Sequence, residues 1–233
     1  MPDGSCPVRS DRRRILPTSV LGSDSRKSIA AGIYAANMPA ELGGGGLDSL
    51  GVTLVDREFG ATSYALQYIV ARPSNILMAC QGEQREKYLL PSVRGEKSDC
   101  LAMTEPGVGS DVRGMKTFAR ADGDDFVING TKHFISHADH ADFVILFAAT
   151  GEEAGPRGTK KLITAFLVDK GTPGFNIARV ETTMGSDVIK LAEIDFVDCK
   201  VPDSAVLGEP GKGFDLAKES LRDGRMAVSC SCI

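Results

Sequence analysis

The spacing of hydrophobic residues along the chain first predicts helices. Between residues 28 and 98 apolar side chains recur at intervals of three or four, the period of an amphipathic helix. The positions that carry this pattern are Ile29, Ile33 and Ala36, then Leu50, Leu54 and Val55 together with Glu58. Asp48 or Ser49 can cap the second of these helices, and a third is expected over residues 62–80. Residues 28–98 are therefore predicted to form a helical N-terminal domain.

Three shorter features of this half of the chain carry separate expectations. Residues 1–27 mix proline, glycine, serine and charged residues without a sustained apolar period, which predicts an irregular leader. A brief helix is expected from residue 82, with Pro91 as its stop. The run from Gly43 to Gly46 is not followed by the Lys-Ser or Lys-Thr of a phosphate-binding loop, so a flexible turn between helices is favoured.

After Asp99 the pattern changes to short apolar runs separated by turn residues, which is typical of strands. The runs span residues 100–103, 126–128, 131–135, 143–148, 162–168, 175–180 and 191–197. Asn129-Gly130, between the second and third runs, is a strong signal for a two-residue hairpin turn. Because no helices separate the runs, residues 99–208 are predicted to form an antiparallel β sandwich or barrel, and a Rossmann fold is improbable.

The helical period returns near the end of the chain. Apolar positions for one helix face are Phe214, Leu216, Ala217, Leu221 and Val228. A single helix without a partner to cover it predicts the opening of a C-terminal helical bundle, truncated at Ile233. Residues 209–233 are assigned to this third region, and the predicted class is an α+β multidomain protein.

Composition and charge narrow the classes of function. The chain has 233 residues, of which 42% are hydrophobic and 25% charged, the balance of a globular protein. A formal net charge of −4 gives no basic footprint for DNA or RNA. No run approaches the roughly 18 apolar residues of a membrane span, and the start of the chain lacks a secretory apolar core, so a cytoplasmic location is expected. The six scattered cysteines favour reduced thiols over a disulfide framework.

The turn over residues 103–111 is the segment best suited to contact a ligand. It reads Met103-Thr104-Glu105-Pro106-Gly107-Val108-Gly109-Ser110-Asp111 and follows a predicted strand. Its glycines let a ligand approach the backbone N–H groups, although an ordinary tight turn is the favoured reading of this segment alone. Glu105 could be proposed as a general base, but a carboxylate that stabilises the turn is favoured.

Three histidines raise the alternative of a metal site. His133, His137 and His140 are close in the sequence, with Asp139 and Asp142 nearby. If His133 and His137 share a strand, they lie about 13 Å apart, too far to ligate one ion. No metal centre is therefore predicted.

Four spaced segments together resemble one protein family. They are Met38-Pro39-Ala40-Glu41-Leu42-Gly43-Gly44, the turn over 103–111, Ile128-Asn129-Gly130-Thr131-Lys132 and Thr172-Pro173-Gly174-Phe175. Their order and spacing are similar to those of the acyl-CoA dehydrogenases, and the resemblance extends from about Ser28 through Val201-Pro202 to the helix with Arg225. It implies the family's helical, β and helical domains and an FAD cofactor.

The resemblance assigns the turn over 103–111 to the cofactor. Thr104, with the backbone around Leu101 and Met103, matches the strand end that hydrogen-bonds the flavin ring. Ser110 matches the serine near the cofactor's phosphates and the mouth of the acyl-CoA cleft, and Gly109 is assigned to the cofactor with it.

A second cofactor segment is implied at residues 134–136. Phe134, Ile135 and Ser136 occupy the place of the family's Trp-Ile-Thr, whose aromatic residue flanks the flavin and whose hydroxyl reaches its reactive nitrogen. The substitutions keep an aromatic ring and a hydroxyl, so chemistry of the same kind is expected. Without the other matches, these residues would read as an ordinary strand with one inward phenylalanine.

Acyl-CoA binding is implied for the last helix. Leu221, Arg222 and Arg225 align with positions that line the substrate site, where the family has an aromatic residue, an acid and an arginine. Arg225 matches this pattern and Arg222 departs from it. A loop that could reach the CoA nucleotide is formed by Thr159, Lys160 and Lys161.

The implied reaction is α,β-dehydrogenation of an acyl-CoA thioester to a trans-2-enoyl-CoA, in which a glutamate removes the α proton. No residue of the chain is assigned as this base. It is expected beyond Ile233, the alternative family position is Gly224, and neither Glu219 nor Asp223 matches. The chain alone is thus expected to be an inactive fragment. A complete member would use an electron-transfer flavoprotein and form a dimer or tetramer. The alternative is a non-catalytic flavin or acyl-CoA binding protein on the same scaffold.

Overall fold

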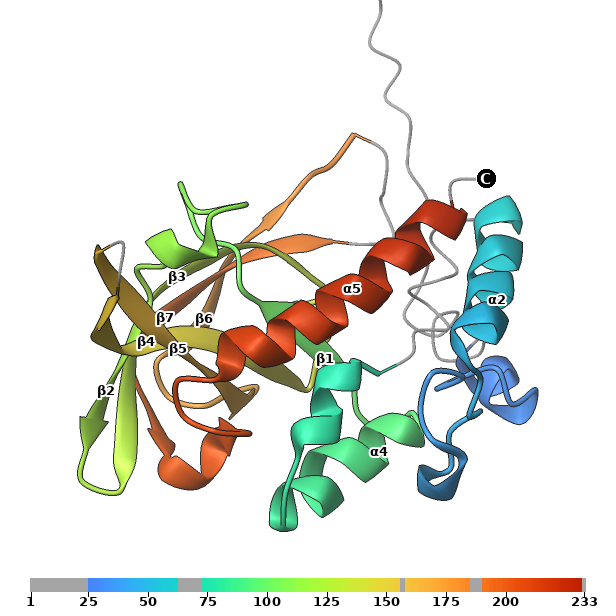
Figure 1. Cartoon of the computed structure of the whole chain (residues 1–233), viewed down its shortest axis with the longest axis horizontal. Helices are drawn as coiled ribbons and strands as arrows, with labels where there is room; N and C mark the ends of the chain where they lie inside the picture. The colour runs from blue at the N-terminus through green and yellow to red at the C-terminus, as the bar shows by residue number, and fades with distance from the viewer. Residues whose placement is uncertain (1–24, 63–72, 156–157, 185–189, 232–233) are drawn as a thin grey trace, which may run out of the picture.

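The computed structural model describes residues 25–62, 73–155, 158–184 and 190–231 and shows helical segments packed against an eight-stranded sheet (Figure 1). The helical elements are η1 (Ala40–Leu42), α2 (Ser49–Thr62), η2 (Asn75–Ala79), η3 (Arg85–Leu89), α4 (Leu90–Val93), η4 (Val112–Gly114), η5 (Asp203–Ala205) and α5 (Gly213–Ser231). The strands are β1 (Asp99–Ala102), β2 (Phe118–Asp122), β3 (Asp125–Ser136), β4 (Phe143–Gly155), β5 (Gly158–Asp169), β6 (Phe175–Glu181), β7 (Leu191–Pro202) and β8 (Val206–Leu207). This order confirms the predicted α+β class.

The sheet is mixed, so the prediction of a purely antiparallel sheet is wrong. Its strand order is β6-β7-β3-β2-β4-β5-β8, with β1 paired to β4 outside this path. β1 and β2 both run parallel to β4, and they share one edge of it: β1 pairs along residues 143–146 and β2 pairs at Ala149. The parallel pairs arise because β4 lies between β5 on one edge and the two earlier strands, β1 and β2, on the other, a long-range arrangement that strand spacing does not encode.

The predicted hairpin at Asn129-Gly130 is also wrong. β2 turns into β3 at Gly123, whose φ is +65°, and Asn129 and Gly130 lie inside β3. The pairing of β3 with β7 shifts register between Ile128 and Gly130, so this Asn-Gly pair marks a bulge. Gly130 is required there because a Cβ atom would lie 2.5 Å from Oγ1 of Thr117.

The hydrophobic core has two parts, one on each face of β4. One face carries Val144, Leu146 and Ala148, which pack within the β domain. The other carries Phe143, Ile145 and Phe147, which pack beneath the helical segments. A strand buried on both faces explains why residues 143–148 form a continuous apolar run. The helical segments and the β domain are therefore joined by shared packing.

The first helical segment differs from the prediction. Residues 25–30 are helical, so residues 25–27 do not belong to an irregular leader, and residues 1–24 lie outside the described part of the chain. Gly32, at a φ of +68°, follows the helix end. Ile29, Ile33 and Ala36 therefore do not share one helix. Of the predicted helix over 62–80, residues 63–72 lie outside the described residues, and 75–79 form the short η2.

The second helical segment is confirmed as α2, but with a different buried face. The backbone N–H of Gly51 donates to Oδ1 of Asp48 at 2.8 Å, which makes Asp48 the capping side chain. Leu50 and Leu54 of the predicted apolar face are 66% and 51% exposed, whereas Asp56 is buried. α2 contacts α5 (Figure 1).

Two further expectations for the N-terminal half are corrected. The helix does not stop at Pro91, because helical backbone continues from η3 into α4 and Pro91 is the second residue of α4. The glycines at 43–46 are packed: the N–H groups of Gly44 and Gly45 donate to Pro39 and Ala35, and a Cβ atom at Gly44 would lie 2.4 Å from the Met38 oxygen. They form a tight internal turn whose N–H groups already have acceptors.

The last helix, α5, begins directly on the sheet. A Cβ atom at Gly213 would lie 2.6 Å from the backbone nitrogen of Ala165 in β5, so only glycine allows this close approach. Ala217 is buried, while Leu221 and Val228 of the predicted apolar face are 37% and 49% exposed. In the described segments, no helix combines the length and hydropathy needed to cross a membrane.

Candidate functional site

The turn after β1 is closed by its own backbone. The N–H of Glu105 donates to the oxygen of Val108 at 3.0 Å, and the N–H of Val108 donates back at 3.0 Å. The carboxylate of Glu105 is buried and accepts hydrogen bonds from the N–H groups of Lys116 and Thr117, at 2.6 and 3.0 Å. The side chain of Glu105 therefore stabilises the turn, which argues against the general base that was considered for it.

A buried ion pair connects this turn to β3. Nζ of Lys132 lies 2.8 Å from Oε1 of Glu105 and donates to the oxygen of Met103 at 3.1 Å. Burial lowers the pKa of Lys132 to about 8, and Glu105 opposes this shift. Burial acts to raise the pKa of Glu105, but hydrogen bonds with Lys132 and Thr117 outweigh it and hold that pKa below its usual value. Both groups are therefore charged at neutral pH.

The two predicted flavin segments lie side by side. The N–H of His133 donates to the oxygen of Thr104 at 2.8 Å, directly beside the contact of Lys132 with Met103. We call the paired residues 103–104 and 132–134 the junction. Sequence reasoning quoted Lys132 as part of a motif and weighed His133 only as a metal ligand, so it missed the role of both in closing this junction.

Phe134 presents its ring outward from the junction. Its φ is +58°, in the left-handed region that a bulky residue rarely adopts, and its side chain is 54% exposed. It lies where the pairing of β3 with β7 shifts register between Lys132 and Ile135. Ile135 is buried in the core, and Ser136 is partly buried beside Leu191 of β7. Of this segment, Phe134 therefore offers the most exposed face.

The other predicted cofactor residues lie along the same turn. Thr104 is partly exposed, while Gly109 and Ser110 are exposed, and no atom lies within 4 Å of the position that a Cβ atom of Gly109 would take. Leu101 and Met103 pack their side chains against the core beneath the helices, and the backbone oxygen of Met103 already accepts from Lys132.

The predicted substrate residues lie elsewhere, on the second half of α5. Leu221, Arg222 and Arg225 are exposed on this helix, which passes from the sheet towards α2 (Figure 1). The backbone of Arg225 makes a local contact, because its oxygen accepts from Oγ of Ser229 at 2.8 Å.

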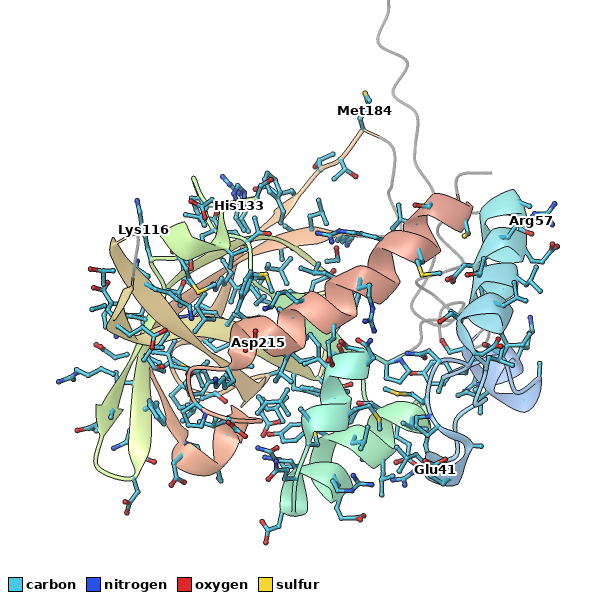
Figure 2. All side chains as sticks on the ribbon, viewed as in Figure 1. Glu41, Arg57, Lys116, His133, Met184 and Asp215 are labelled. Atoms are coloured by element: carbon cyan, nitrogen blue, oxygen red, sulfur yellow. The ribbon has the colours of Figure 1, made fainter. Side chains whose placement is uncertain are left out.

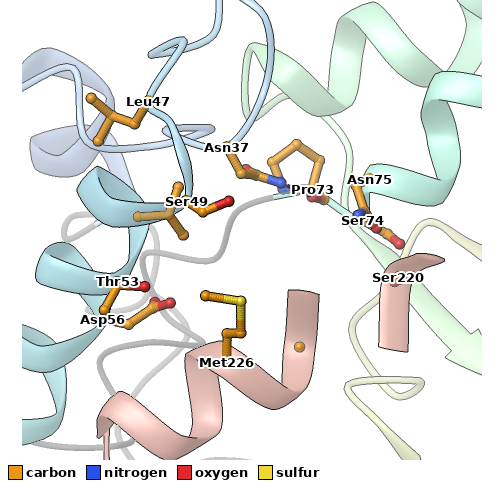
Figure 3. A pocket seen from close by; sticks show the side chains of 12 residues that line it. Asn37, Leu47, Ser49, Thr53, Asp56, Pro73, Ser74, Asn75, Ser220 and Met226 are labelled. Atoms are coloured by element: carbon orange, nitrogen blue, oxygen red, sulfur yellow. Dashed lines mark hydrogen bonds between the residues drawn. The ribbon is translucent and has the colours of Figure 1, made fainter. Parts of the chain in front are cut away.

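A cavity of about 250 Å³ lies between α2, α5 and residues 73–75 (Figure 3). Gly224 lines it, and so does Asp56, a buried carboxylate that sequence reasoning did not select. Helix spacing could have indicated its burial, because Val52 and Phe59 lie four residues before and three after it. A second, more open cavity of about 660 Å³ lies beside Lys87 and Asp169. The junction lines neither.

A group of possible metal ligands occurs beside the junction. Within the described segments, one group of three such residues places its ligand atoms within 4.8 Å of one another: His133, Glu181 and Glu193. This is a different set from the histidines weighed in the sequence. Arg179 donates to Glu181 at 2.7 Å and to Glu193 at 3.2 Å, so one guanidinium already occupies an oxygen of each carboxylate. The cluster combines ion pairs between β6 and β7 with a hydrogen bond from β3.

The predicted basic loop at 159–161 is part of strand β5 instead. Lys160 pairs with Glu153 of β4 at 3.0 Å, and the ammonium of Lys161 donates to the backbone oxygen of Met115. Both lysines therefore already have partners within the chain, which weakens the case for a contact with the CoA nucleotide.

Comparison with known proteins identifies the family. Residues 9–96 match the description "Acyl-CoA dehydrogenase, N-terminal domain", and residues 100–199 match "Acyl-CoA dehydrogenase, middle domain". The chain belongs to the acyl-CoA dehydrogenase family. It is 33% identical over 228 residues to the human mitochondrial short-chain specific acyl-CoA dehydrogenase, covering 96% of this chain and 53% of that protein.

Solved structures share the fold. Butyryl-CoA dehydrogenase from Megasphaera elsdenii superposes with a TM-score of 0.79 at 33% identity, covering 93% of this chain and 57% of that one. The FAD complex of PigA also gives a TM-score of 0.79, at 27% identity, with 93% and 56% covered. The chain thus spans somewhat more than half the length of these relatives.

Proposed function

We propose that residues 1–233 form the flavin-facing part of an FAD-dependent acyl-CoA dehydrogenase, which converts an acyl-CoA thioester to a trans-2-enoyl-CoA. The observation that carries this proposal is the junction, in which Lys132 and His133 hold the turn after β1 against β3. The junction and the neighbouring Ser136 suit a flavin ring, because Phe134 offers an aromatic face and Thr104 and Ser136 offer hydroxyl groups. When bound, FAD accepts the hydride that leaves the β carbon of the substrate.

Each cofactor residue is given a role that fits its position. Thr104 and the backbone of Leu101 and Met103 hydrogen-bond the edge of the flavin ring. Phe134 would cover a flank of the ring and Ser136 would offer its hydroxyl to the reactive nitrogen, while Ile135 anchors the segment in the core. Gly109 and Ser110 contact the phosphates, where the open space beside Gly109 allows close approach.

Substrate contacts are proposed for Ser110 and for α5. Leu221 lines the acyl site, and the guanidinium groups of Arg222 and Arg225 bind a CoA phosphate or orient a carboxylate. Gly224 has no side chain, so we assign no base within residues 1–233 and place it beyond Ile233. An electron-transfer flavoprotein is the proposed oxidant, and a dimer or tetramer is the proposed assembly of a complete enzyme.

The proposal is tested by titrating FAD into the purified chain and following the quenching of its fluorescence, up to FAD concentrations on the order of 100 μM. F134A and S136A should each weaken binding severalfold. Phe118 provides a matched control, because it is 47% exposed on β2 and outside the junction, so F118A should bind FAD as the wild type does. Equal loss in F118A and F134A would contradict the assignment.

Turnover separates the enzyme from the alternative, a non-catalytic flavin or acyl-CoA binding protein on the same scaffold. The observation that favours this alternative is the absence of a carboxylate at Gly224. Acyl-CoA-dependent dye reduction should be undetectable with residues 1–233. A longer chain that supplies a suitably placed glutamate should restore it. Tight binding of FAD and CoA with no turnover in any longer form would support the binding protein.

A further inference from the structure

We propose that His133 is a positioning residue that holds the ring of Phe134 in its flavin-facing orientation. This inference rests on the proposed function and adds a residue that the resemblance to the family did not assign. It begins with the conformation of Phe134, because a φ of +58° and a 54% exposed side chain leave this ring without the support of the core. Another group must therefore keep the ring in place.

His133 supplies this support through a ring stack. The centroids of the two rings are 3.8 Å apart, and the ring planes are inclined by 14°. Neighbouring residues of a regular strand point to opposite faces of the sheet, so their rings do not stack. The register shift between Lys132 and Ile135, together with the left-handed φ of Phe134, brings both rings to the same side.

The imidazole is itself fixed by groups on two other strands. Its Nε2 atom lies 3.3 Å from Oε1 of Glu181 on β6 and 3.6 Å from Oε2 of Glu193 on β7. Arg179 holds the same two carboxylates, at 2.7 and 3.2 Å. The His133 side chain is only 18% exposed, so it has little room to turn away from Phe134.

The backbone of His133 also connects the stacked rings to the turn that carries Thr104. Its N–H donates to the oxygen of Thr104, so the residue that supports Phe134 also contacts the strand end proposed to bind the flavin edge. One residue thereby sets the relative position of the aromatic flank and the hydrogen-bonding edge. Figure 2 shows His133 over the sheet, well away from Arg57 on α2.

Three variants separate the ring from the polar atom of His133. H133F keeps a ring and loses Nε2, H133Q keeps a polar group and loses the ring, and H133A loses both. H140A is the matched control, because His140 is 48% exposed and follows β3 in the next turn. Without FAD, NMR of the wild type should show the His133 ring protons shifted upfield by Phe134, and F134A should abolish this shift.

With FAD, H133A and H133Q should bind about three- to tenfold more weakly than wild type, the factor that loss of one ring stack implies. H133F should restore only part of the wild-type affinity, because it keeps a stacked ring but loses the contacts of Nε2 with Glu181 and Glu193, and H140A should not change binding. A missing upfield shift, or FAD affinity equal in H133A and wild type, would overturn the positioning role of His133 and leave the proposed function standing. A wild type that shows the shift but binds no FAD would overturn the proposed function and, with it, the positioning role.

Discussion

Nζ of Lys132 lies 2.8 Å from Oε1 of Glu105, and the two side chains are 0% and 3% exposed. The pair connects β3 to the turn after β1, because Lys132 also donates to the oxygen of Met103 and Glu105 accepts from two backbone N–H groups. A charge pair removed from water is held by these additional bonds, so the loss of one partner leaves the other in an unfavourable environment.

Removal of Lys132 is therefore expected to be costly. K132M should lower the free energy of unfolding by about 3–5 kcal/mol, because Glu105 is left buried with an unpaired charge. Urea denaturation followed by circular dichroism measures the change. The double variant E105Q/K132M should recover part of the loss. K160M is the control, since Lys160 pairs with Glu153 at the surface, and its denaturation midpoint should match wild type.

The same pair predicts a dependence of stability on pH. Burial lowers the pKa of Lys132 to about 8, below its ordinary value of 10.5, so the folded chain releases this proton at a lower pH than the unfolded chain. Between these values the unfolded chain binds more protons, and the contribution of Lys132 to stability rises with pH. The difference in unfolding free energy between wild type and E105Q/K132M should increase from pH 8 to 9.5. A flat difference would contradict the assigned shift.

Gly130 should not tolerate a side chain. G130A places a Cβ atom 2.5 Å from Oγ1 of Thr117 at a φ of +145°, so it combines a clash with an unfavourable backbone conformation. G158A has a left-handed φ of +106° but no atom within 4 Å, which makes it a control for backbone strain alone. The melting temperature should fall further for G130A than for G158A. Equal changes in melting temperature would show that Thr117 moves aside at little cost, so that the clash adds nothing to the backbone strain.

The cap of α2 gives a smaller, local prediction. Asp48 accepts the hydrogen bond of the Gly51 N–H, so D48A should destabilise the protein by about 1 kcal/mol, whereas D48N should be close to neutral. Thermal denaturation of both variants measures the difference. If D48N lost as much stability as D48A, the hydrogen bond would not be the stabilising interaction.

The sequence predicted elements best where local pattern and final burial agree. Residues 143–148 were found because β4 is buried on both faces, and the α2 cap was found because Asp48 serves its own helix. The hairpin predicted at Asn129-Gly130 was wrong because a bulge uses the same left-handed flexibility of the backbone as a hairpin turn. The parallel pairing of β1 with β4 was not predicted, because strand partners far apart in sequence leave no local signal.

In the candidate site too, residues with a local sequence signal were predicted and contacts between distant residues were not. Thr104 and Phe134 were selected through resemblance to a family, and the residues that join their segments were not. The bond from His133 to Thr104 and the pair between Lys132 and Glu105 cross many residues of sequence, and a buried lysine contradicts the usual expectation for its type. Asp56 was overlooked for a similar reason, since a charged residue within a helix normally faces solvent.

The pairing of β3 with β7 also bears on the order in which the protein folds. β3 precedes β4, β5 and β6 in the chain, yet its partner along residues 125–136 is β7. Contacts between distant segments form late, because the entropy of closing the intervening loop must be overcome first. We therefore expect the β2–β3 and β4–β5 hairpins to form early and the strand that carries Phe134 to gain its second neighbour near the end of folding. The surface proposed to hold the flavin would then be among the last parts of the sheet to acquire its native shape.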